Sequence, residues 1–276
     1  MTTLNRRGFL AAAPAIALAP SFASAHNPSA VTAKLLQRMR GSIADSFPSQ
    51  DPEVVSGVVG ASHTNLDRVK ELVTKRPQLA KAAWDWGFGD WETALGACSH
   101  TGRRDIAEFL IAHGARPDIF TFAMLGQVDV VRAFCTANPG IQRNVGPHGT
   151  FTLMRHARVG RDDAKLVVEY LEELGDADIA QPKIDMTEAN ASPYMGTYSP
   201  NDAPGVKFIV AYNERQTSPT FAVEDGTPRA LFSRGNHIFN PGGAPNVVFT
   251  FSIDSDKPML HIQDGELELT AERVPA

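Results

Sequence analysis

The sequence predicts an α + β protein built from a run of helical repeats followed by a small antiparallel β-domain. The first observation is that apolar residues recur at helical spacing through residues 51–180. The second is that after Gln181 and Pro182 this spacing gives way to short alternating runs separated by Gly, Pro, Asn and Asp. The chain has 276 residues, 43% of them hydrophobic, which is enough for one or two globular domains.

The first 25 residues have the pattern of an export signal. Arg6 and Arg7 precede an alanine-rich apolar stretch at 11–22, and small residues follow at 23–25. This order is typical of a secretory signal peptide. The apolar stretch is too short for a stable membrane span, so no stable membrane insertion is expected. We expect a mature chain that begins at His26.

The paired arginines followed by Gly-Phe-Leu resemble the bacterial twin-arginine export motif. The resemblance implies a periplasmic or secreted protein. A general secretion signal with a chance arginine pair is the alternative.

Charge and cysteine content exclude some classes of protein. The net charge is −5 and no basic run occurs, so no nucleic-acid partner is expected. Only two cysteines are present, Cys98 and Cys135, so the fold does not depend on a disulfide framework. The two could pair in an oxidising compartment or remain buried free thiols.

The clearest repeat unit covers residues 93–115. It has the small pair Cys98 and Ser99 in its first helix and ends in Gly114. Its second helix carries an apolar stripe at i, i+3 and i+4, namely Ile106, Phe109 and Leu110. This unit resembles the ankyrin repeat. The resemblance implies a stack whose projecting loops bind protein partners.

Three weaker copies flank this unit, so the resemblance covers about four units within 51–180. A stack of this kind needs polar caps at its ends. The segment 26–50 is predicted to supply a linker and a capping helix, because apolar residues recur at helical spacing within it.

A linker at 181–192 is predicted to lead into a β-domain at 193–276. Alternation predicts strands at residues 207–212, 247–253, 259–262 and 266–271. Tyr194, Gly196 and Tyr198 at its start, with Arg273 and Val274 at its end, resemble the accessory domain of penicillin-binding-type serine hydrolases. The resemblance implies a lipocalin-like half-barrel.

Searches for catalytic and metal-binding motifs are negative. The chain contains no Ser-x-x-Lys and no Gly-x-Ser-x-Gly, so we expect it not to be an enzyme. It contains no His-Glu-x-x-His and no Cys-x-x-Cys, so neither a metal site nor a cofactor is expected. His63 and His100 fall at the same position of successive repeats and are interpreted as a surface feature.

All three tryptophans lie in one short loop. Tryptophan is enriched at binding hot spots, so the loop is predicted to bind an unidentified protein partner, and packing onto the repeats is the alternative. The candidate partner-binding residues are Trp84, Trp86, Phe88 and Trp91, together with His63 and His100.

The predicted function is that of an exported, non-catalytic binding protein that mediates protein–protein interaction. The alternative is a small-molecule binding protein, or a hydrolase-related enzyme, that uses the mouth of the β-barrel. That mouth would lie near Tyr198, Tyr212, Arg234 and His237. An interior filled by aromatic side chains would argue against the alternative.

Overall fold

A computed structural model of the chain describes residues 46–180, 182–254 and 257–275. The chain divides into two compact units at the boundary between Phe47 and Pro48, and the elements discussed here all belong to the second unit. The predicted signal peptide at 1–25, and most of the predicted capping segment at 26–50, lie outside the described residues. Within the described residues, no helix has the length and apolar character that a membrane crossing needs.

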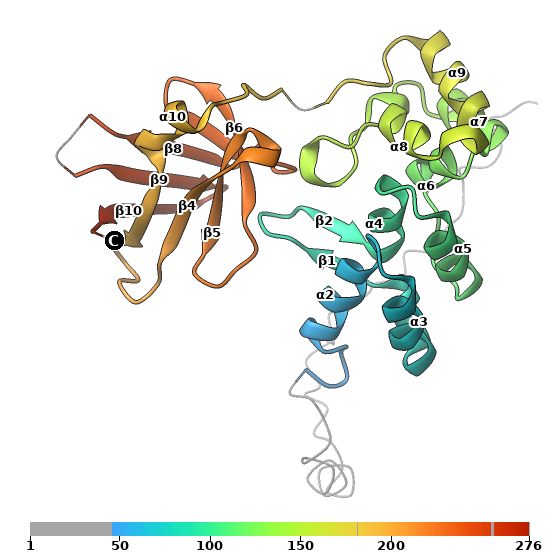
Figure 1. The fold of residues 1–276 in the computed structure, drawn as a ribbon, viewed down its shortest axis with the longest axis horizontal. Helices are drawn as coiled ribbons and strands as arrows, with labels where there is room; N and C mark the ends of the chain where they lie inside the picture. Colours follow the sequence, from blue (N-terminus) through green and yellow to red (C-terminus); the bar gives the residue numbers. More distant parts are fainter. Residues whose placement is uncertain (1–45, 181, 255–256, 276) are drawn as a thin grey trace, which may run out of the picture. The chain divides into compact units, whose positions relative to one another are not determined.

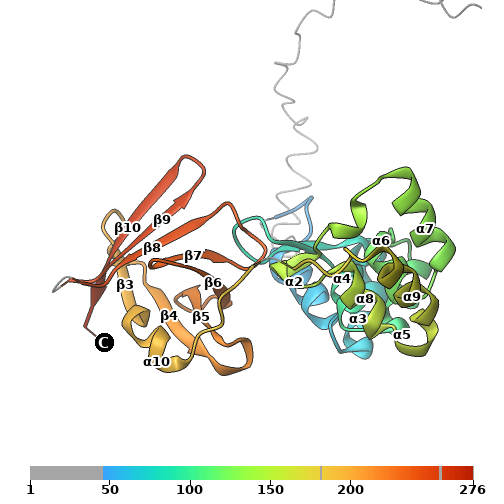
Figure 2. The same cartoon turned by 90° about the horizontal axis from the view of Figure 1, so that it is seen from above.

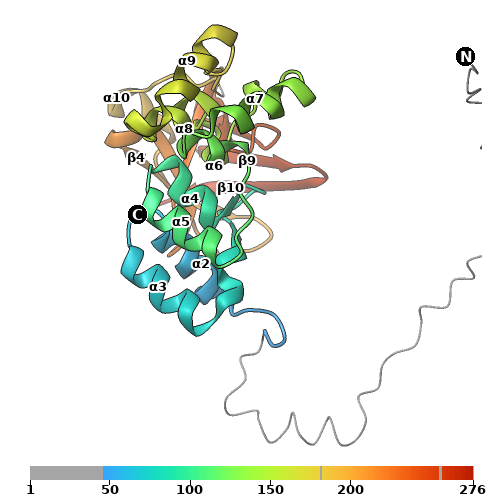
Figure 3. The same cartoon turned by 90° about the vertical axis from the view of Figure 1, so that its right-hand side faces the viewer.

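Eight helices follow one another in four pairs through the first part of this unit (Figure 1). They are α2 (Pro52–Ala61), α3 (Leu66–Lys75), α4 (Ala94–His100), α5 (Arg104–Ala112), α6 (Ile119–Met124), α7 (Val128–Ala137), α8 (Leu153–Val159) and α9 (Lys165–Leu174). Helix α4 packs against α2, α6 and α8, while α3 packs against α5 and α7 against α9. Figure 3 shows these helices from the side.

Local chemistry fixes where these helices begin. The side chains of Asp51, Asn65, Thr93, Asp118 and Thr152 each accept a hydrogen bond from a backbone N–H in the first turn of the helix that follows. Such a cap satisfies a donor that has no partner within the helix. The polar residues between the apolar stripes therefore set the helix boundaries.

The apolar stripes form two adjoining cores. Val58, Val69 and Ile106 belong to the core nearer the start of the unit. Leu153 and Leu171 belong to the second core. All five side chains are fully buried, as the helical periodicity requires.

Irregular segments interrupt the helices. A hairpin of strands β1 (Ala83–Asp85) and β2 (Trp91–Thr93) stands between α3 and α4. Short 3₁₀ helices lie at η1 (Pro77–Lys81), η2 (Ile141–Arg143), η3 (Pro147–Gly149) and η4 (Arg161–Ala164). Two of these insertions, the β1–β2 hairpin and η3, contribute residues to the candidate site.

The second part of the unit is a closed antiparallel barrel of eight strands (Figure 2). The strands are β3 (Gly196–Pro200), β4 (Phe208–Asn213), β5 (Ser218–Val223), β6 (Arg229–Gly235), β7 (Ile238–Pro241), β8 (Val248–Ser252), β9 (Met259–Asp264) and β10 (Leu267–Val274). Strand β10 pairs with both β9 and β3, and this second pairing closes the barrel. Helix α10 (Glu188–Ala191), η5 (Ser192–Tyr194) and η6 (Glu214–Gln216) accompany it.

Aromatic side chains fill the barrel interior. Tyr198, Phe239 and Phe249 are fully buried there, and Phe208, Phe221 and Phe251 join the same cluster. Their rings meet mainly at steep angles, as Phe221 and Phe249 do at 78° with centroids 5.0 Å apart. Edge-to-face contact of this kind is favourable for aromatic pairs.

The predicted fold class, an ankyrin-type helical repeat stack followed by a lipocalin-like half-barrel, is wrong. The sheet is not open, because β10 closes it on β3. Nine α-helices occur in the described residues, with the hairpin and 3₁₀ segments between them, rather than a regular stack. The expected alternating strands occur as β4, β8, β9 and β10, but β5, β6 and β7 were not predicted.

The reason for these misses lies in the pattern of burial. In β5 five successive residues, 218–222, are buried, so the strand shows no alternation of apolar and polar side chains. Strand β7 is only four residues long and ends in Pro241, which reads as a turn signal in sequence.

Candidate metal centre

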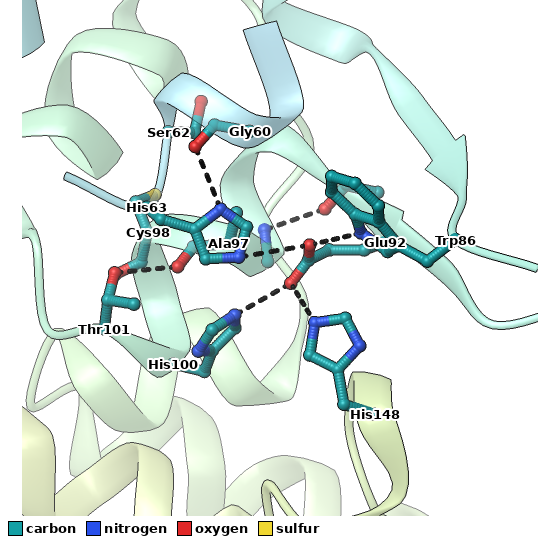
Figure 4. Close-up of polar contacts among 12 residues, drawn as sticks. Gly60, Ser62, His63, Trp86, Glu92, Ala97, Cys98, His100, Thr101 and His148 are labelled. Atoms are coloured by element: carbon teal, nitrogen blue, oxygen red, sulfur yellow. Dashed lines mark hydrogen bonds and ion pairs between the residues drawn. The ribbon is translucent and has the colours of Figure 1, made fainter. Parts of the chain in front are cut away.

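The carboxylate of Glu92 in β2 is the centre of a buried polar cluster (Figure 4). Its side chain is 0% exposed. The indole Nε1 of Trp86 donates a hydrogen bond to Oε2 at 2.7 Å. His100 Nε2 lies 2.8 Å from Oε1. A carboxylate is buried in this way only where polar partners surround it.

Two further imidazoles approach the same carboxylate. His63 Nε2 lies 3.4 Å from Oε2, and His148 Nε2 lies 3.5 Å from Oε1. The ligand-type atoms of His63, Glu92, His100 and His148 all lie within 4.8 Å of one another. Three imidazole nitrogens and a carboxylate oxygen therefore converge on one point.

Four separate segments supply these side chains. His63 lies in the turn between α2 and α3, and His100 is the last residue of α4. Glu92 immediately precedes Thr93, the N-cap of α4, so the start of that helix fixes its position. His148 lies in η3 with a φ of +66°, a backbone conformation that residues other than glycine seldom adopt. Helix α2 packs against α4 and against β1, which brings three of the segments together.

The outer nitrogens of two of the imidazoles are fixed by groups that can only accept. His63 Nδ1 lies 3.1 Å from the carbonyl oxygen of Gly60. His148 Nδ1 lies 2.7 Å from Oδ2 of Asp90. Each Nδ1 therefore carries the hydrogen, and in a neutral ring Nε2 presents its lone pair to the centre of the cluster. Metal-ligating histidines show this arrangement of an outer carbonyl or carboxylate.

The charged groups of the cluster shift one another's pKa values. Burial alone would raise the pKa of Glu92, but hydrogen bonds from His100 and His148 hold it well below its usual range. Burial opposes the charged form of His148 too, yet hydrogen bonds to Asp90 and Glu92 raise its pKa to about 9. For His100, burial outweighs the hydrogen bond to Glu92 and lowers the pKa. At neutral pH the proton on His148 thus offsets the charge of the Glu92 carboxylate.

Asp90 connects this cluster to the barrel. Its buried carboxylate accepts a hydrogen bond from the backbone N–H of His148 at 2.9 Å and forms an ion pair with Arg229 of β6. Burial would raise the pKa of Asp90, but the hydrogen bond from His148 and the charge of Arg229 lower it. The same carboxylate therefore orients one imidazole and binds a guanidinium of the barrel.

A cavity of about 640 Å³ adjoins the cluster. His63, His148 and Trp86 line it, together with Arg229 and Phe232 of β6. A ligand in this cavity would contact two of the three imidazoles, because both belong to its wall.

The four aromatic residues predicted to bind a partner lie in or beside the β1–β2 hairpin, in different environments. Trp86 contacts Glu92, and Trp84 packs on the first helical core. Phe88 is partly buried and packs against the barrel core, with its ring centroid 5.9 Å from that of Phe221 and 5.6 Å from that of Phe249. Trp91 alone among the four is strongly exposed, at 65%.

The loop tip around Phe88 requires glycine on both sides. Gly87, Phe88 and Gly89 all have positive φ values, of 113°, 60° and 77°. Two glycines adopt this conformation without strain, so the chain can turn sharply enough to direct Phe88 into the barrel.

His63 and His100 are neighbours in space, with ring centroids 5.0 Å apart. Their interpretation as a surface feature of the repeats is wrong for His100, which is buried. Sequence reasoning missed Glu92, Asp90 and His148. The search for local ligand motifs had no means of finding them, since the ligands come from four separate segments.

The two cysteines do not form a disulfide bond. Both Cys98 and Cys135 are buried free thiols, and burial raises the pKa of each.

The barrel interior is filled by side chains, which argues against a ligand site inside it. At the proposed barrel mouth, the Tyr194 hydroxyl lies 2.9 Å from His237 Nδ1 and the Arg234 Nε donates to Asn240 at 2.7 Å.

Comparison with protein families, curated proteins and solved structures finds no match for the chain.

Proposed function

We propose that this protein binds a divalent transition-metal ion, for which Zn²⁺ is the best fit, next to a small-molecule cavity. The ligands are Nε2 of His63, His100 and His148 and the carboxylate of Glu92. The observation that carries the proposal is the convergence of these four ligand atoms within 4.8 Å. Imidazole with one carboxylate is a donor set that suits zinc and similar ions better than magnesium or calcium.

The distances fit a tetrahedral ion. Ligands at about 2.05 Å from zinc are separated from one another by about 3.3 Å in a regular tetrahedron. The separation of 3.5 Å between His148 Nε2 and Glu92 Oε1 is close to this value. His63 Nε2 lies 3.4 Å from the other carboxylate oxygen, Oε2, so the ion would be held by one oxygen after a small rotation of the carboxylate. The His100–Glu92 separation of 2.8 Å is shorter, so the ion would push these two groups apart by about half an ångström.

The outer contacts also support metal binding. In a neutral ring, the Nε2 lone pair of His63 faces the carboxylate of Glu92, and two acceptors repel each other unless a cation or a proton lies between them. A metal ion removes this conflict at His63 and, with loss of its proton, at His148. Asp90 would then orient the ligating ring of His148.

The test is a metal titration of the chain by calorimetry, with Co²⁺ absorption spectra as a second measurement. We expect one Zn²⁺ per chain. In the double variant His63→Ala/His148→Ala, affinity should fall by about 100-fold or more, because two ligands are lost. His113→Ala is the matched control, since His113 is exposed and hydrogen-bonds only to its own helix. Absence of binding by the wild-type chain, or equal binding by the double variant, would contradict the proposal.

A second candidate function is recognition of a partner protein, and the exposure of Trp91 favours it. Large exposed aromatic side chains are common at interfaces. The test is affinity capture from a periplasmic extract with wild-type chain and Trp91→Ala. Capture of the same proteins in equal amounts would remove Trp91 from this role.

We also propose that the protein acts outside the cytoplasm, on the basis of the Arg6 and Arg7 motif. A reporter fused to the first 30 residues should be exported. Replacement of both arginines by lysine should block export by the twin-arginine route, and continued export of that variant would contradict it.

A further inference from the structure

The cavity beside the metal ligands has a strongly one-sided charge. Among the residues that the structure describes, four cationic side chains line it and no acidic side chain does so; the four are Arg155, Lys183, Arg215 and Arg229. A cavity with this lining attracts negative charge, because the low-dielectric walls weaken the screening by water. The chain as a whole carries a net charge of −5, so the positive lining is a local feature.

Two of these four charges are neutralised by the protein itself. Arg229, 10% exposed, is paired with Asp90 and also donates to the carbonyl oxygen of Gly242. Lys183 lies 2.8 Å from Asp185 and donates to the carbonyl oxygen of Gln216. These two side chains are therefore held in place as parts of the wall.

The other two charges have no acidic partner. Within the described part of the chain, the side chains of Arg155 and Arg215 form neither an ion pair nor a hydrogen bond. Both guanidinium groups keep all five N–H donors for a ligand or for water. An anion that entered the cavity would meet two cations that no carboxylate of the protein already occupies.

Arg155 is positioned next to the metal ligands through Phe151. Its guanidinium lies 4.5 Å from the centroid of the Phe151 ring. That ring stacks on His100, with centroids 4.1 Å apart and an angle of 8° between the planes. A single aromatic ring thus separates a free guanidinium from a metal ligand.

The rest of the lining fits an organic molecule. Trp86, Phe151, Pro228 and Phe232 supply flat apolar surface, while Thr150 and Asn213 supply hydrogen-bonding groups. A volume of about 640 Å³ lies within the range of small-molecule sites, roughly 300 to 1,000 Å³.

We propose that this cavity binds a small organic anion, a carboxylate or a phosphate ester with a flat apolar body. Its anionic group interacts with Arg155 and Arg215, and its body lies against the aromatic wall. This proposal rests on the lining of the cavity and not on the metal ion of the function proposed above.

The experiment measures binding of phenyl phosphate and benzoate to the Zn²⁺-loaded chain by calorimetry. Benzamide is the neutral control and inorganic phosphate is the control without an apolar body. The test variant is Arg155→Gln/Arg215→Gln, and Arg116→Gln is matched to it, because Arg116 is exposed and lies outside the cavity lining. Zn²⁺ affinity is measured separately for each variant.

We expect at least one of the two aromatic anions to bind, with benzamide at least tenfold weaker. The double arginine variant should lose about tenfold in anion affinity while its Zn²⁺ affinity and the binding by Arg116→Gln stay unchanged. Failure of both anions to bind, or equal binding by the double variant, would overturn the proposal. Inorganic phosphate that binds as tightly as phenyl phosphate would overturn the assignment of an organic ligand. A chain that takes up no Zn²⁺ would overturn the metal proposal instead.

Discussion

The barrel interior and the cluster around Glu92 are both buried and both rich in rings, yet they are built by opposite rules. In the barrel, Phe249 contacts the rings of Phe88 and Phe221, which carry no polar atom that needs a partner. In the cluster, three imidazoles and an indole surround a carboxylate. Burial of apolar rings stabilises the folded barrel. Burial of a carboxylate among imidazoles costs free energy, so an arrangement of this kind is typical of a functional site.

The β1–β2 hairpin and its loop contribute to both regions. Phe88 packs in the barrel, while Trp86, Asp90 and Glu92 face the polar cluster. One short segment therefore connects the stabilising core of the barrel to the candidate site. Substitutions in the two regions should therefore affect different measurements.

The largest expected effect is on stability. Phe249→Ala removes a fully buried ring from the barrel and should lower the free energy of unfolding by about 3–5 kcal/mol. Urea unfolding measures this loss, and Zn²⁺ affinity of the folded variant should not change. Leu267→Ala, at an exposed position of β10, is the control and should cost less than about 0.5 kcal/mol. A parallel loss of metal affinity in Phe249→Ala would break the separation of the two regions.

The next effect depends on pH. His156 is fully buried, its Nε2 has no partner, and burial lowers its pKa to about 4. In the unfolded chain the His156 imidazole takes up a proton near its ordinary pKa of about 6.5. The free energy of unfolding should therefore fall by about 3 kcal/mol as the pH drops from about 6.5 to about 4. Below that window both states hold the proton, and the loss stops.

Urea unfolding of the metal-free chain at about pH 7 and about pH 4.5 measures this dependence. His156→Gln should reduce the difference between the two pH values, and His113→Gln should leave it as in the wild type. An equal pH dependence in His156→Gln would show that other groups cause it.

Metal binding should stabilise the folded state. Zn²⁺ at about 100 times its dissociation constant should add about 2.7 kcal/mol to the free energy of unfolding. The gain should be absent from His63→Ala/His148→Ala and present in His113→Ala. Thermal unfolding with and without the ion gives the comparison, and equal gains in the wild type and the double variant would point to binding elsewhere.

Loss of an outer contact should have a smaller effect. Asp90→Asn keeps the shape of the side chain but removes the charge next to His148 and Arg229. Zn²⁺ affinity should fall by about 10- to 100-fold, as expected when an orienting partner of a ligand is changed. Asp129→Asn, at an exposed position, is the control. Unchanged affinity in Asp90→Asn would show that the aspartate does not orient the ligand.

The smallest effect is expected at Trp91. Because its side chain is exposed, Trp91→Ala should change the free energy of unfolding by less than about 0.5 kcal/mol and leave Zn²⁺ affinity unaltered. A larger loss would mean that the tryptophan is part of the folded core and not free to meet a partner.

Part of the fold could be predicted from sequence because it depends on local chemistry. The apolar spacing of Ile106 and Leu110 produces the helix α5, and the cap residue Thr93 marks the start of α4. Alternation likewise indicated β4 and β8. Strands β5 and β7 have no such pattern, since burial in a closed barrel replaces it.

The candidate metal centre was not predicted, because the sequence contains no local ligand motif and we expected no metal site. Comparison of the repeats singled out His63 and His100 but did not predict that their rings lie next to each other. Glu92 lies in a hairpin that interrupts the helices, and His148 in a 3₁₀ turn with a left-handed backbone. Nothing local in the sequence indicates that these four residues lie together.

The sequence by itself determined which segments are helical, where several of them start, and that the last part of the chain forms strands. These features depend on side chains within a few residues of one another. Only the tertiary structure decided that β10 closes the barrel on β3, that Phe88 packs against the barrel core, and that Glu92 is surrounded by imidazoles. Each of these contacts joins residues far apart in the chain. Such a contact stabilises the fold only after the intervening chain has been closed into a loop, so local sequence patterns do not indicate it.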